Sequence, residues 1–211
     1  MTSSPPGWYQ RLFAWLMAHG TAQYETAVSD RKQALFADLQ GTVLEIGPGA
    51  GANFSYYPAS VQWTGIEPNP YMHAYLRERA DEANLQIHIQ TGHAERLEAE
   101  DSSVDAVIST LVLCSVNNLD GVLQEILRVL KPGGTFYFLE HVAAPPQTFL
   151  RRVQGGLKPA WRVIGDGCCL DRDTGPAIEA AGFERVSYDR FRAPVPAIVS
   201  PQIIGRAIKS S

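Results

Sequence analysis

The chain has 211 residues, of which 45% are hydrophobic and 19% are charged, and its formal net charge at pH 7 is −4. This length allows one well-buried core but not two domains of typical size, and the composition excludes a disordered chain. The 18 lysine and arginine residues are scattered, so the sequence predicts no nucleic-acid partner, because binding to phosphates requires clustered positive charge.

The cysteines and the N-terminus indicate the compartment. The three cysteines, Cys114, Cys168 and Cys169, are odd in number and form no CxxC pair, which argues against a disulfide framework or a structural zinc site. Met1 leads into a Pro/Ser segment instead of a signal peptide, and no segment approaches the ~20 apolar residues that a spanning helix needs. We therefore expect a cytoplasmic protein, with peripheral contact to a membrane as the alternative.

Two helices are expected before the first strand. After a flexible start at residues 3–7, Trp8, Leu12, Trp15 and Leu16 recur at helical spacing. A second helix is predicted over residues 29–39, with Ser29 as its N-cap.

From Thr42 onward, strands alternate with helices. The segments TVLEIG, VQWTGIEP, LQIHIQTG, VDAVIST and TFYFLEH are predicted strands, and the glycines after the first strand are expected to turn into a helix. Helices are predicted in NPYMHAYLRERADEA and LDGVLQEILRVLK. This alternation is typical of a parallel sheet that is covered on both faces.

The alternation breaks after His141. Residues 142–170 form a long interruption, and such loops in α/β domains are commonly functional. DRDTGPAIEAAGF then predicts a helix, and FERVSYDRFR and IIGRAIK predict two antiparallel strands. The predicted fold is α/β and Rossmann-like: a seven-stranded, mostly parallel sheet with an antiparallel C-terminal edge strand and helices on both faces.

The stretch GPGAGA, residues 47–52, fits both a dinucleotide turn and the turn that binds S-adenosylmethionine, and by itself it is weak evidence. Glu45 precedes the first glycine by two residues, where a carboxylate would face a ligand ammonium group and would repel a pyrophosphate. Glu67 ends the second predicted strand, where an acid can accept both hydroxyls of a ribose. Solvated loop carboxylates are the alternative for both residues.

Two later segments add context. Gly92-His93-Ala94-Glu95 follows the third predicted strand, where a polar side chain can bond an adenine amino group; an exposed loop is an equally good interpretation. The second segment, Leu130-Lys131-Pro132-Gly133-Gly134, follows a predicted helix and precedes a predicted strand. Its residues are ordinary helix C-cap residues, so only its place in the order of elements helps to indicate the class of protein.

Together, residues 42–140 resemble the class I S-adenosylmethionine-dependent methyltransferases. The resemblance implies that the glycine turn approaches the methionine part and the ribose of the cofactor, that Glu67 holds the ribose hydroxyls, and that Asn69 and Pro70 flank the adenine. The product is then S-adenosylhomocysteine. The predicted cofactor-binding residues are Glu45, Gly47, Gly49, Gly51, Glu67, Pro68, Asn69, His93, Ala94, Glu95 and Leu111.

The acceptor is expected at the carboxyl ends of the fourth and fifth strands. His141 follows the fifth strand and can take a proton near neutral pH, or it is bonded to loop backbone. Asp166, between two glycines, is either a carboxylate at the acceptor mouth or a turn residue. Both are predicted catalytic residues. Cys114 is predicted to be core or pocket wall, and no metal is expected, because adjacent cysteines such as Cys168 and Cys169 rarely form a site alone.

A narrower resemblance depends on TLVLCSV, LRVLKPGG, FLEHVAAP, the Trp161 region and DGCCLDRDT, with GANFSYYP and EPNP. These segments resemble the methyltransferase-like family of membrane-associated alkyl thiol S-methyltransferases. The resemblance implies S-methylation of small, lipophilic thiols, with the acceptor enclosed by the N-terminal helix and by residues 142–170.

That family begins with a long hydrophobic anchor, whereas Arg11 and His19 interrupt the apolar face of the short N-terminal segment here. Residues 1–40 are therefore expected to form a helical lid or an interfacial segment, with the lid favoured because Arg11 supplies little positive charge. Residues 41–211 form the methyltransferase domain, and residues 142–170 are its acceptor-site insertion.

The predicted function is methyl transfer from S-adenosylmethionine to a small thiol, with no metal. N-, O- or C-methylation of a phospholipid amine, a phenol or a quinone-type ring remains open, as does a non-catalytic protein that binds S-adenosylmethionine.

Overall fold

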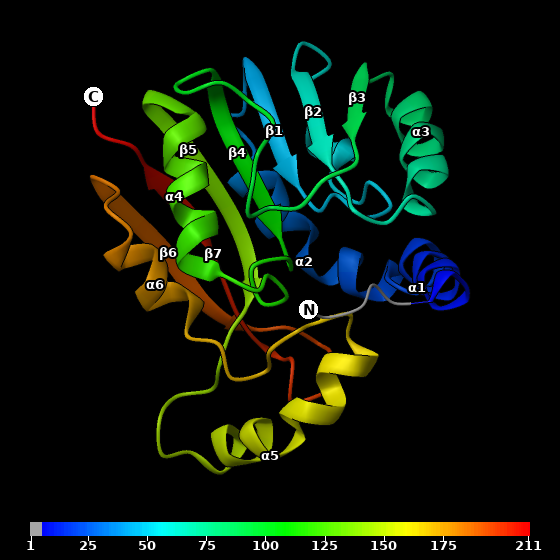
Figure 1. The fold of residues 1–211 in the computed structure, drawn as a ribbon, viewed down its shortest axis with the longest axis vertical. Coiled ribbons are helices and arrows are strands. Elements are labelled where there is room, and N and C mark those ends of the chain that lie inside the picture. Colours follow the sequence, from blue (N-terminus) through cyan, green and yellow to red (C-terminus); the bar gives the residue numbers. More distant parts are fainter. Residues whose placement is uncertain (1–5) are drawn as a thin grey trace.

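The computed structural model describes residues 6–211, so the predicted flexible start falls largely outside the described part of the chain. A seven-stranded sheet in the order β3-β2-β1-β4-β5-β7-β6 forms its centre (Figure 1). The strands are β1 (Thr42–Ile46), β2 (Gln62–Ile66), β3 (Ile87–Gln90), β4 (Val104–Thr110), β5 (Leu130–His141), β6 (Arg185–Arg192) and β7 (Pro201–Ile208).

The predicted sheet is confirmed. Strands β1 to β5 pair in parallel, and β7 pairs antiparallel with both β5 and β6. Because β7 is inserted between its two neighbours, β6 is the edge strand and runs in the same direction as β5. The sheet order reverses at β1 and β4, and this switch point puts the carboxyl ends of β1, β2, β4 and β5 at one edge of the sheet. Open α/β sheets bind their ligands in a crevice at this place.

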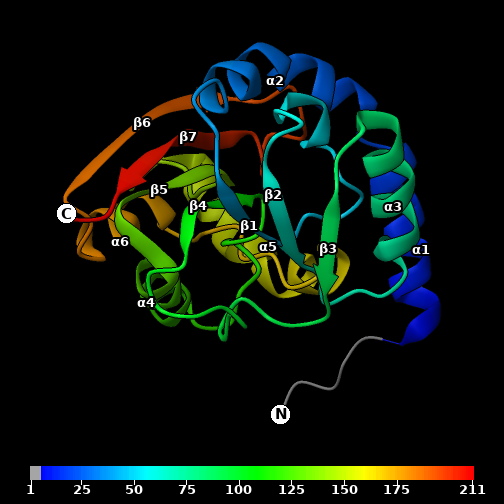
Figure 2. The same cartoon turned by 90° about the horizontal axis from the view of Figure 1, so that it is seen from above.

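Within residues 6–211 the helices are α1 (Gly7–His19), α2 (Ala22–Leu35), α3 (Met72–Ala83), α4 (Leu119–Val129), α5 (Phe149–Ile164) and α6 (Thr174–Ala180), with a 3-10 turn at Phe54–Tyr56. Helices α2 and α3 cover one face of the sheet, and α4 and α6 cover the other (Figure 2). Successive strand residues point to opposite faces, so Val43 packs with α2 and α3 while Leu44 packs with α4 and α6. Two apolar cores therefore hold the switch point rigidly.

Three predicted elements differ from the observed ones. The second helix spans Ala22–Leu35, and Ser29 lies inside it, where its hydroxyl donates to the Thr26 carbonyl. The helix is fixed by buried residues at helical spacing, including Lys32, whose ammonium lies 2.6 Å from Glu25. The glycine turn is followed by the short 3-10 turn and not by an α-helix.

The third difference lies in the interruption. Residues 142–170 contain the 16-residue helix α5, and Thr148 caps it by accepting a hydrogen bond from the Arg151 backbone N–H. Glycine and proline inside α5 mask its helical pattern in the sequence. None of the helices described is both long and apolar enough to cross a membrane.

Candidate active site

The glycine turn after β1 lies at the centre of the crevice. Gly47, Gly49 and Gly51 have φ of 57°, 58° and 81°, values that side-chain-bearing residues rarely adopt. A Cβ on Gly47 would come within 2.7 Å of Val112, whereas a Cβ on Gly49 would meet nothing within 4 Å. The turn therefore packs tightly at Gly47 and leaves bare backbone open at Gly49.

Glu67, at the end of β2, is tied to this turn. Its carboxylate accepts the backbone N–H of Gly49 at 3.0 Å and that of Asn69 at 2.8 Å, and the side chain is buried. Burial raises the pKa of Glu67 to about 7, although these two hydrogen bonds oppose the shift. Carboxylate oxygens have several lone pairs, so capacity remains for hydroxyl donors of a ligand.

Glu45 is buried deeper, under the turn. Its carboxylate accepts hydrogen bonds from Asn53 at 2.7 Å, Tyr57 at 3.0 Å and Trp63 at 2.8 Å. Burial raises the pKa of Glu45 above its usual range, and the three donors work against that shift. The role of Glu45 toward an ammonium group stays a prediction, since three protein donors already bind its oxygens.

These three donors are not predicted by the sequence. Asn53 Nδ2 also donates to the Thr110 hydroxyl at 3.0 Å, so it links the ends of β1 and β4. Its Oδ1 is buried and has no hydrogen-bond partner within residues 6–211. The only sequence signal was the polar and aromatic character of GANFSYYP. An unpaired buried acceptor beside the glycine turn fits a ligand donor group.

The other predicted cofactor residues surround the same crevice. Pro68 is exposed, whereas Asn69 is buried and its side chain donates to the Gln10 carbonyl of α1 at 3.0 Å. His93 is exposed and Ala94 is buried; Glu95 accepts the Asn117 backbone N–H at 2.8 Å and so links the loops after β3 and β4.

The loop after β4 is held by Glu140. Leu111 begins this loop with φ of 59°, and its N–H donates to the Leu139 carbonyl. The Glu140 carboxylate accepts from the Ser109 hydroxyl at 2.6 Å and from the backbone N–H groups of Val112 and Leu113. Burial raises the pKa of Glu140 to about 7. Glu140 therefore positions the acceptor side of the crevice by satisfying loop amides.

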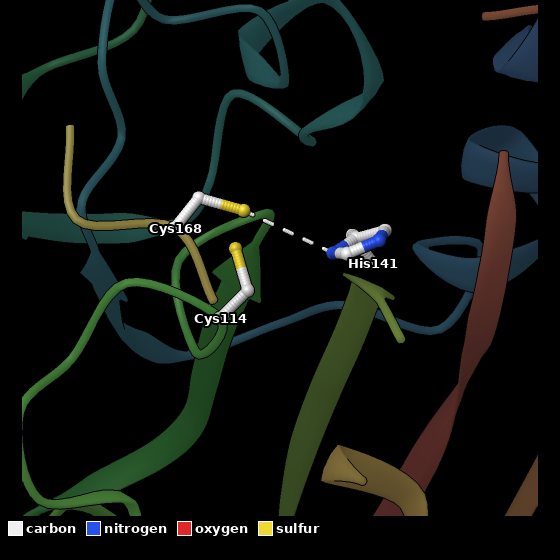
Figure 3. A group of neighbouring side chains, drawn as sticks. All are labelled: Cys114, His141 and Cys168. Carbon is white, nitrogen blue, oxygen red and sulfur yellow. Dashed lines mark hydrogen bonds between the residues drawn. The ribbon is translucent and has the colours of Figure 1, made fainter. Parts of the chain in front are cut away.

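Two cysteine side chains and one histidine side chain meet at the ends of β4 and β5 (Figure 3). The Cys114, His141 and Cys168 side chains are buried, and one ligand atom from each lies within 4.8 Å of the others. Cys168 Sγ lies 3.9 Å from His141 Nδ1, and His141 Nε2 lies 3.2 Å from the Ile198 carbonyl. The histidine thus bonds loop backbone with one nitrogen and faces the cysteines with the other. We call this group the Cys–His cluster.

This cluster is not predicted by the sequence. Cys168 and Cys169 are adjacent in the sequence, but Cys168 lies beside Cys114 in the structure, and the Cys169 thiol donates to the Gly167 carbonyl. The proximity of the two clustered thiols lowers the pKa of Cys168 and raises that of Cys114. His141 further lowers the pKa of Cys168, and burial further raises that of Cys114. The pairing depends on the fold, because 54 residues separate these cysteines.

Asp166 lies in the turn after α5, with φ of 47°. Desolvation raises its pKa, and its charge acts on Glu67 and on Tyr9. The Tyr9 hydroxyl donates to the carbonyls of Val163 and Ile164, each at 3.1 Å, which fastens α1 to the end of α5. Asp166 is thus a turn residue by conformation, and its charge acts both on Glu67 of the crevice and on Tyr9 of α1.

The crevice therefore has two sides. Glu45, Gly49, Glu67 and Asn69 lie at the ends of β1 and β2, and the Cys–His cluster lies at the ends of β4 and β5. The open backbone at Gly49, the Glu67 carboxylate and the unpaired Asn53 oxygen fit a nucleoside that carries an amino-acid tail. The second side would then face the reactive end of that molecule.

Comparisons with known proteins agree with this arrangement. The family described as Methyltransferase domain matches residues 44–138. The chain is 37% identical to thiol S-methyltransferase TMT1A of Homo sapiens over 95% of this chain and 87% of the relative. It is 40% identical to thiol S-methyltransferase TMT1B of Rattus norvegicus over 93% of this chain and 86% of that protein.

Among solved structures, the [4+2]-cyclase SpnF superposes with a TM-score of 0.68 at 19% identity, over 88% of this chain and 82% of that one. At this identity the likeness shows the fold alone. Fold, crevice and family match together define a class I S-adenosylmethionine-dependent methyltransferase. More narrowly, the chain belongs to the family of the thiol S-methyltransferases.

Proposed function

We propose that this enzyme transfers the methyl group of S-adenosylmethionine to the sulfur of a small, lipophilic thiol. The observation that carries the proposal is the likeness to thiol S-methyltransferases over 95% of the chain, which extends beyond the cofactor half into the acceptor segments. The cytoplasmic location expected from the sequence belongs to this proposal, as does the division into a lid at residues 1–40 and a catalytic domain at residues 41–211.

On the cofactor side, the proposed residues bind and orient S-adenosylmethionine. Gly49 leaves room for the ligand at the turn, Glu67 accepts the ribose hydroxyls, and Asn69 flanks the adenine. When bound, S-adenosylmethionine supplies an electrophilic methyl group on a sulfonium. The buried Glu67 carboxylate then gains two donors in place of water, which favours its charged form.

On the acceptor side, we propose that His141 and Asp166 promote ionisation of the thiol. A thiol has a reference pKa near 8.5, so only a small fraction is thiolate at neutral pH. His141 Nδ1 faces the cluster at the end of β5, and Asp166 flanks the crevice from the turn after α5. Methyl transfer is an in-line displacement, so the remaining requirement is positioning.

The direct test compares two acceptors that differ only in the reacting atom. Hexanethiol and hexan-1-ol are incubated separately with the protein and S-adenosylmethionine, and the products are identified by mass spectrometry. The proposal predicts methyl hexyl sulfide and no methyl hexyl ether. Binding of S-adenosylhomocysteine without thioether formation from any thiol would overturn the thiol assignment.

The exposed surface of α1 and α5 favours contact with a membrane, which we propose as a second property of the protein. The large apolar side chains exposed on α1 and α5 are Trp8, Leu12, Trp15, Leu16, Phe149, Leu157, Val163 and Ile164. α5 carries four lysine and arginine residues and no acidic residue. Arg151 and Lys158 pair with Asp173 and Asp171, so Arg152 and Arg162 are the residues that supply the positive charge that α1 lacks. Apolar side chains beside basic ones fit an anionic lipid surface, and such a surface would deliver lipophilic acceptors.

Co-sedimentation with vesicles tests this property. We expect wild type to sediment with phosphatidylcholine–phosphatidylserine vesicles, and Trp15→Asp to sediment less. Ser187→Asp, on the exposed face of β6, is the matched control, because it adds the same charge away from α1 and α5. Absence of wild type from the pellet at every lipid composition would remove the membrane proposal, and the phospholipid-amine alternative with it.

A further inference from the structure

The Cys–His cluster has the composition of a metal site. We propose that Cys114, His141 and Cys168 bind one soft divalent metal ion, best matched by Zn²⁺, and that the acceptor thiol occupies the fourth position. The ion site follows from the cluster itself. The role of its fourth position rests on the proposed function, because it assumes a thiol acceptor.

The spacing of the ligand atoms is close to what an ion requires. Tetrahedral zinc with the usual bond lengths separates two sulfur ligands by about 3.8 Å, and a sulfur from a nitrogen by about 3.6 Å. The observed distance from Cys168 Sγ to His141 Nδ1 is 3.9 Å, and all three atoms lie within 4.8 Å. Shortening these distances by at most about 1.2 Å, the difference between 4.8 Å and the sulfur–nitrogen spacing, gives the tetrahedral geometry.

The histidine is already oriented as a ligand. Its Nε2 lies 3.2 Å from the Ile198 carbonyl and donates to it, which leaves the lone pair of Nδ1 facing the cysteines. Metal-binding histidines commonly donate their other N–H to a carbonyl or a carboxylate, which fixes the tautomer. Ile198 is held in turn by Gln154 of α5, a buried amide that donates to the same carbonyl at 2.9 Å and accepts the Ala144 N–H at 2.8 Å.

The chemistry of the ligands selects the ion. Two thiolates and a neutral imidazole carry a charge of −2, which a divalent ion neutralises in this buried place. Thiolate and imidazole suit zinc better than magnesium or calcium, which prefer oxygen ligands. The other contacts of Cys114 Sγ are weak, at 3.7 Å to the Leu111 carbonyl and to the Ser115 hydroxyl, so the sulfur remains available.

Three protein ligands leave one position open, as in catalytic zinc sites, whereas structural zinc sites use four. An acceptor thiol that displaces water from this position loses its proton to solvent, because a coordinated thiol is deprotonated. The thiolate sulfur then donates an electron pair to the methyl carbon, and the bond from that carbon to the sulfonium sulfur breaks with its pair left on that sulfur. His141 thus acts on the thiol as a ligand of the ion.

Metal binding is the first test. The protein is stripped with a chelator under reducing conditions and titrated with Co²⁺, whose absorption reports tetrahedral thiolate ligation, and then with Zn²⁺ in competition. We expect one ion per chain, and affinity reduced at least about tenfold in Cys114→Ser and in Cys168→Ser. Cys169→Ser is the matched control, since its sulfur points to Gly167 and not to the cluster.

Affinity for S-adenosylhomocysteine shows that each variant is folded. Failure of the folded wild type to bind one ion, or equal loss of binding in Cys169→Ser, would overturn the metal site.

Activity separates this inference from the proposed function. We expect thiol methylation to fall at least about tenfold in the stripped protein and to return with Zn²⁺. Full activity of stripped protein with thiols would overturn the role of the fourth position and leave both the ion site and the proposed function intact. One bound ion with no thiol product would overturn the proposed function, and with it the role of the fourth position, but would leave the ion site.

Discussion

Glu67 is the residue on which cofactor binding is expected to depend most. Its carboxylate already receives two backbone donors and has lone pairs left for two ribose hydroxyls. Hydrogen bonds to a charged acceptor contribute about 1.5–3 kcal/mol each, so we expect Glu67→Ala to weaken binding of S-adenosylhomocysteine by about tenfold or more. Calorimetric titration measures this directly. Glu78→Ala, on the exposed side of α3, is the control, and equal affinities for all three proteins would remove the assignment.

Asp166 carries a separate prediction on the acceptor side. We expect Asp166→Asn to lower turnover with a thiol by about tenfold, because the amide cannot accept the thiol proton on its way to solvent. Affinity for S-adenosylhomocysteine should stay close to that of wild type, since Asp166 makes no predicted contact with the cofactor. Steady-state kinetics and calorimetry together test this. Unchanged turnover would mean that Asp166 serves only the turn after α5.

For individual residues, the sequence predicted their places in the fold better than it predicted their hydrogen-bond partners. Glu45 and Glu67 lie at the ends of β1 and β2 as expected, because strand ends follow from local hydrophobic patterning. The donors to Glu45 come from residues 8 to 18 positions later, and the fold alone determines that they meet it. The Cys–His cluster has the same cause, since its members come from three separate segments.

Helix α1 connects the two sides of the crevice. Its Gln10 carbonyl accepts from Asn69, and its Tyr9 hydroxyl donates to the end of α5. Only Ala14 of α1 is buried, so these polar contacts and the stacking of Arg11 on Tyr71 contribute much of its attachment. A helix attached in this way can open locally while the rest of the protein stays folded.

Removing the Tyr9 hydroxyl should therefore loosen α1 selectively. An exposed hydrogen bond of this kind contributes about 1 kcal/mol, so we expect Tyr9→Phe to speed amide exchange within α1 by roughly fivefold. Exchange in β4 and β5 should not change. Tyr56→Phe, on the 3-10 turn, is the matched control. Equal exchange of α1 in all three proteins would contradict its role as a lid fastened to α5.

Among the elements, periodicity predicted α1, α3, α4 and the sheet well. The second helix was placed too late because Ser29 looks like a cap, whereas burial of Tyr24, Val28 and Lys32 determines where the helix lies. Helix α5 was missed because its two glycines and Pro159 weaken the local signal. Packing of Gln154 and the ion pair of Arg151 with Asp173 compensate for that weakness.

For the whole molecule, two buried carboxyl groups predict an unusual pH dependence of stability. Burial raises the pKa of Glu67 and of Glu140 to about 7, whereas an unfolded glutamate titrates near pH 4.3. Between these values the folded protein binds more protons than the unfolded chain, so the free energy of unfolding decreases as pH rises. The stabilisation that these protonated groups contribute is fully present below about pH 4.3 and is lost as the pH rises through about 7.

We therefore expect the Tm of the ligand-free protein to fall by several degrees between pH 5 and pH 8. Glu140→Gln should show a smaller decrease, because its amide does not ionise, and Glu78→Gln should follow wild type. Differential scanning calorimetry in buffers of equal ionic strength provides the comparison. A Tm that rises over this interval, or an unchanged slope in Glu140→Gln, would contradict the account.

The proposed acceptor is a thiol. The most direct measurement is one competition reaction with S-adenosylmethionine and equal concentrations of an aliphatic thiol, hydrogen sulfide, a phenol and an amine, with all methylated products quantified by mass spectrometry. We expect methylated sulfur products to exceed the methylated phenol and the methylated amine. Methylation of the amine or the phenol in preference to every thiol would contradict it, and would leave a methyltransferase of this fold whose acceptor is nitrogen or oxygen.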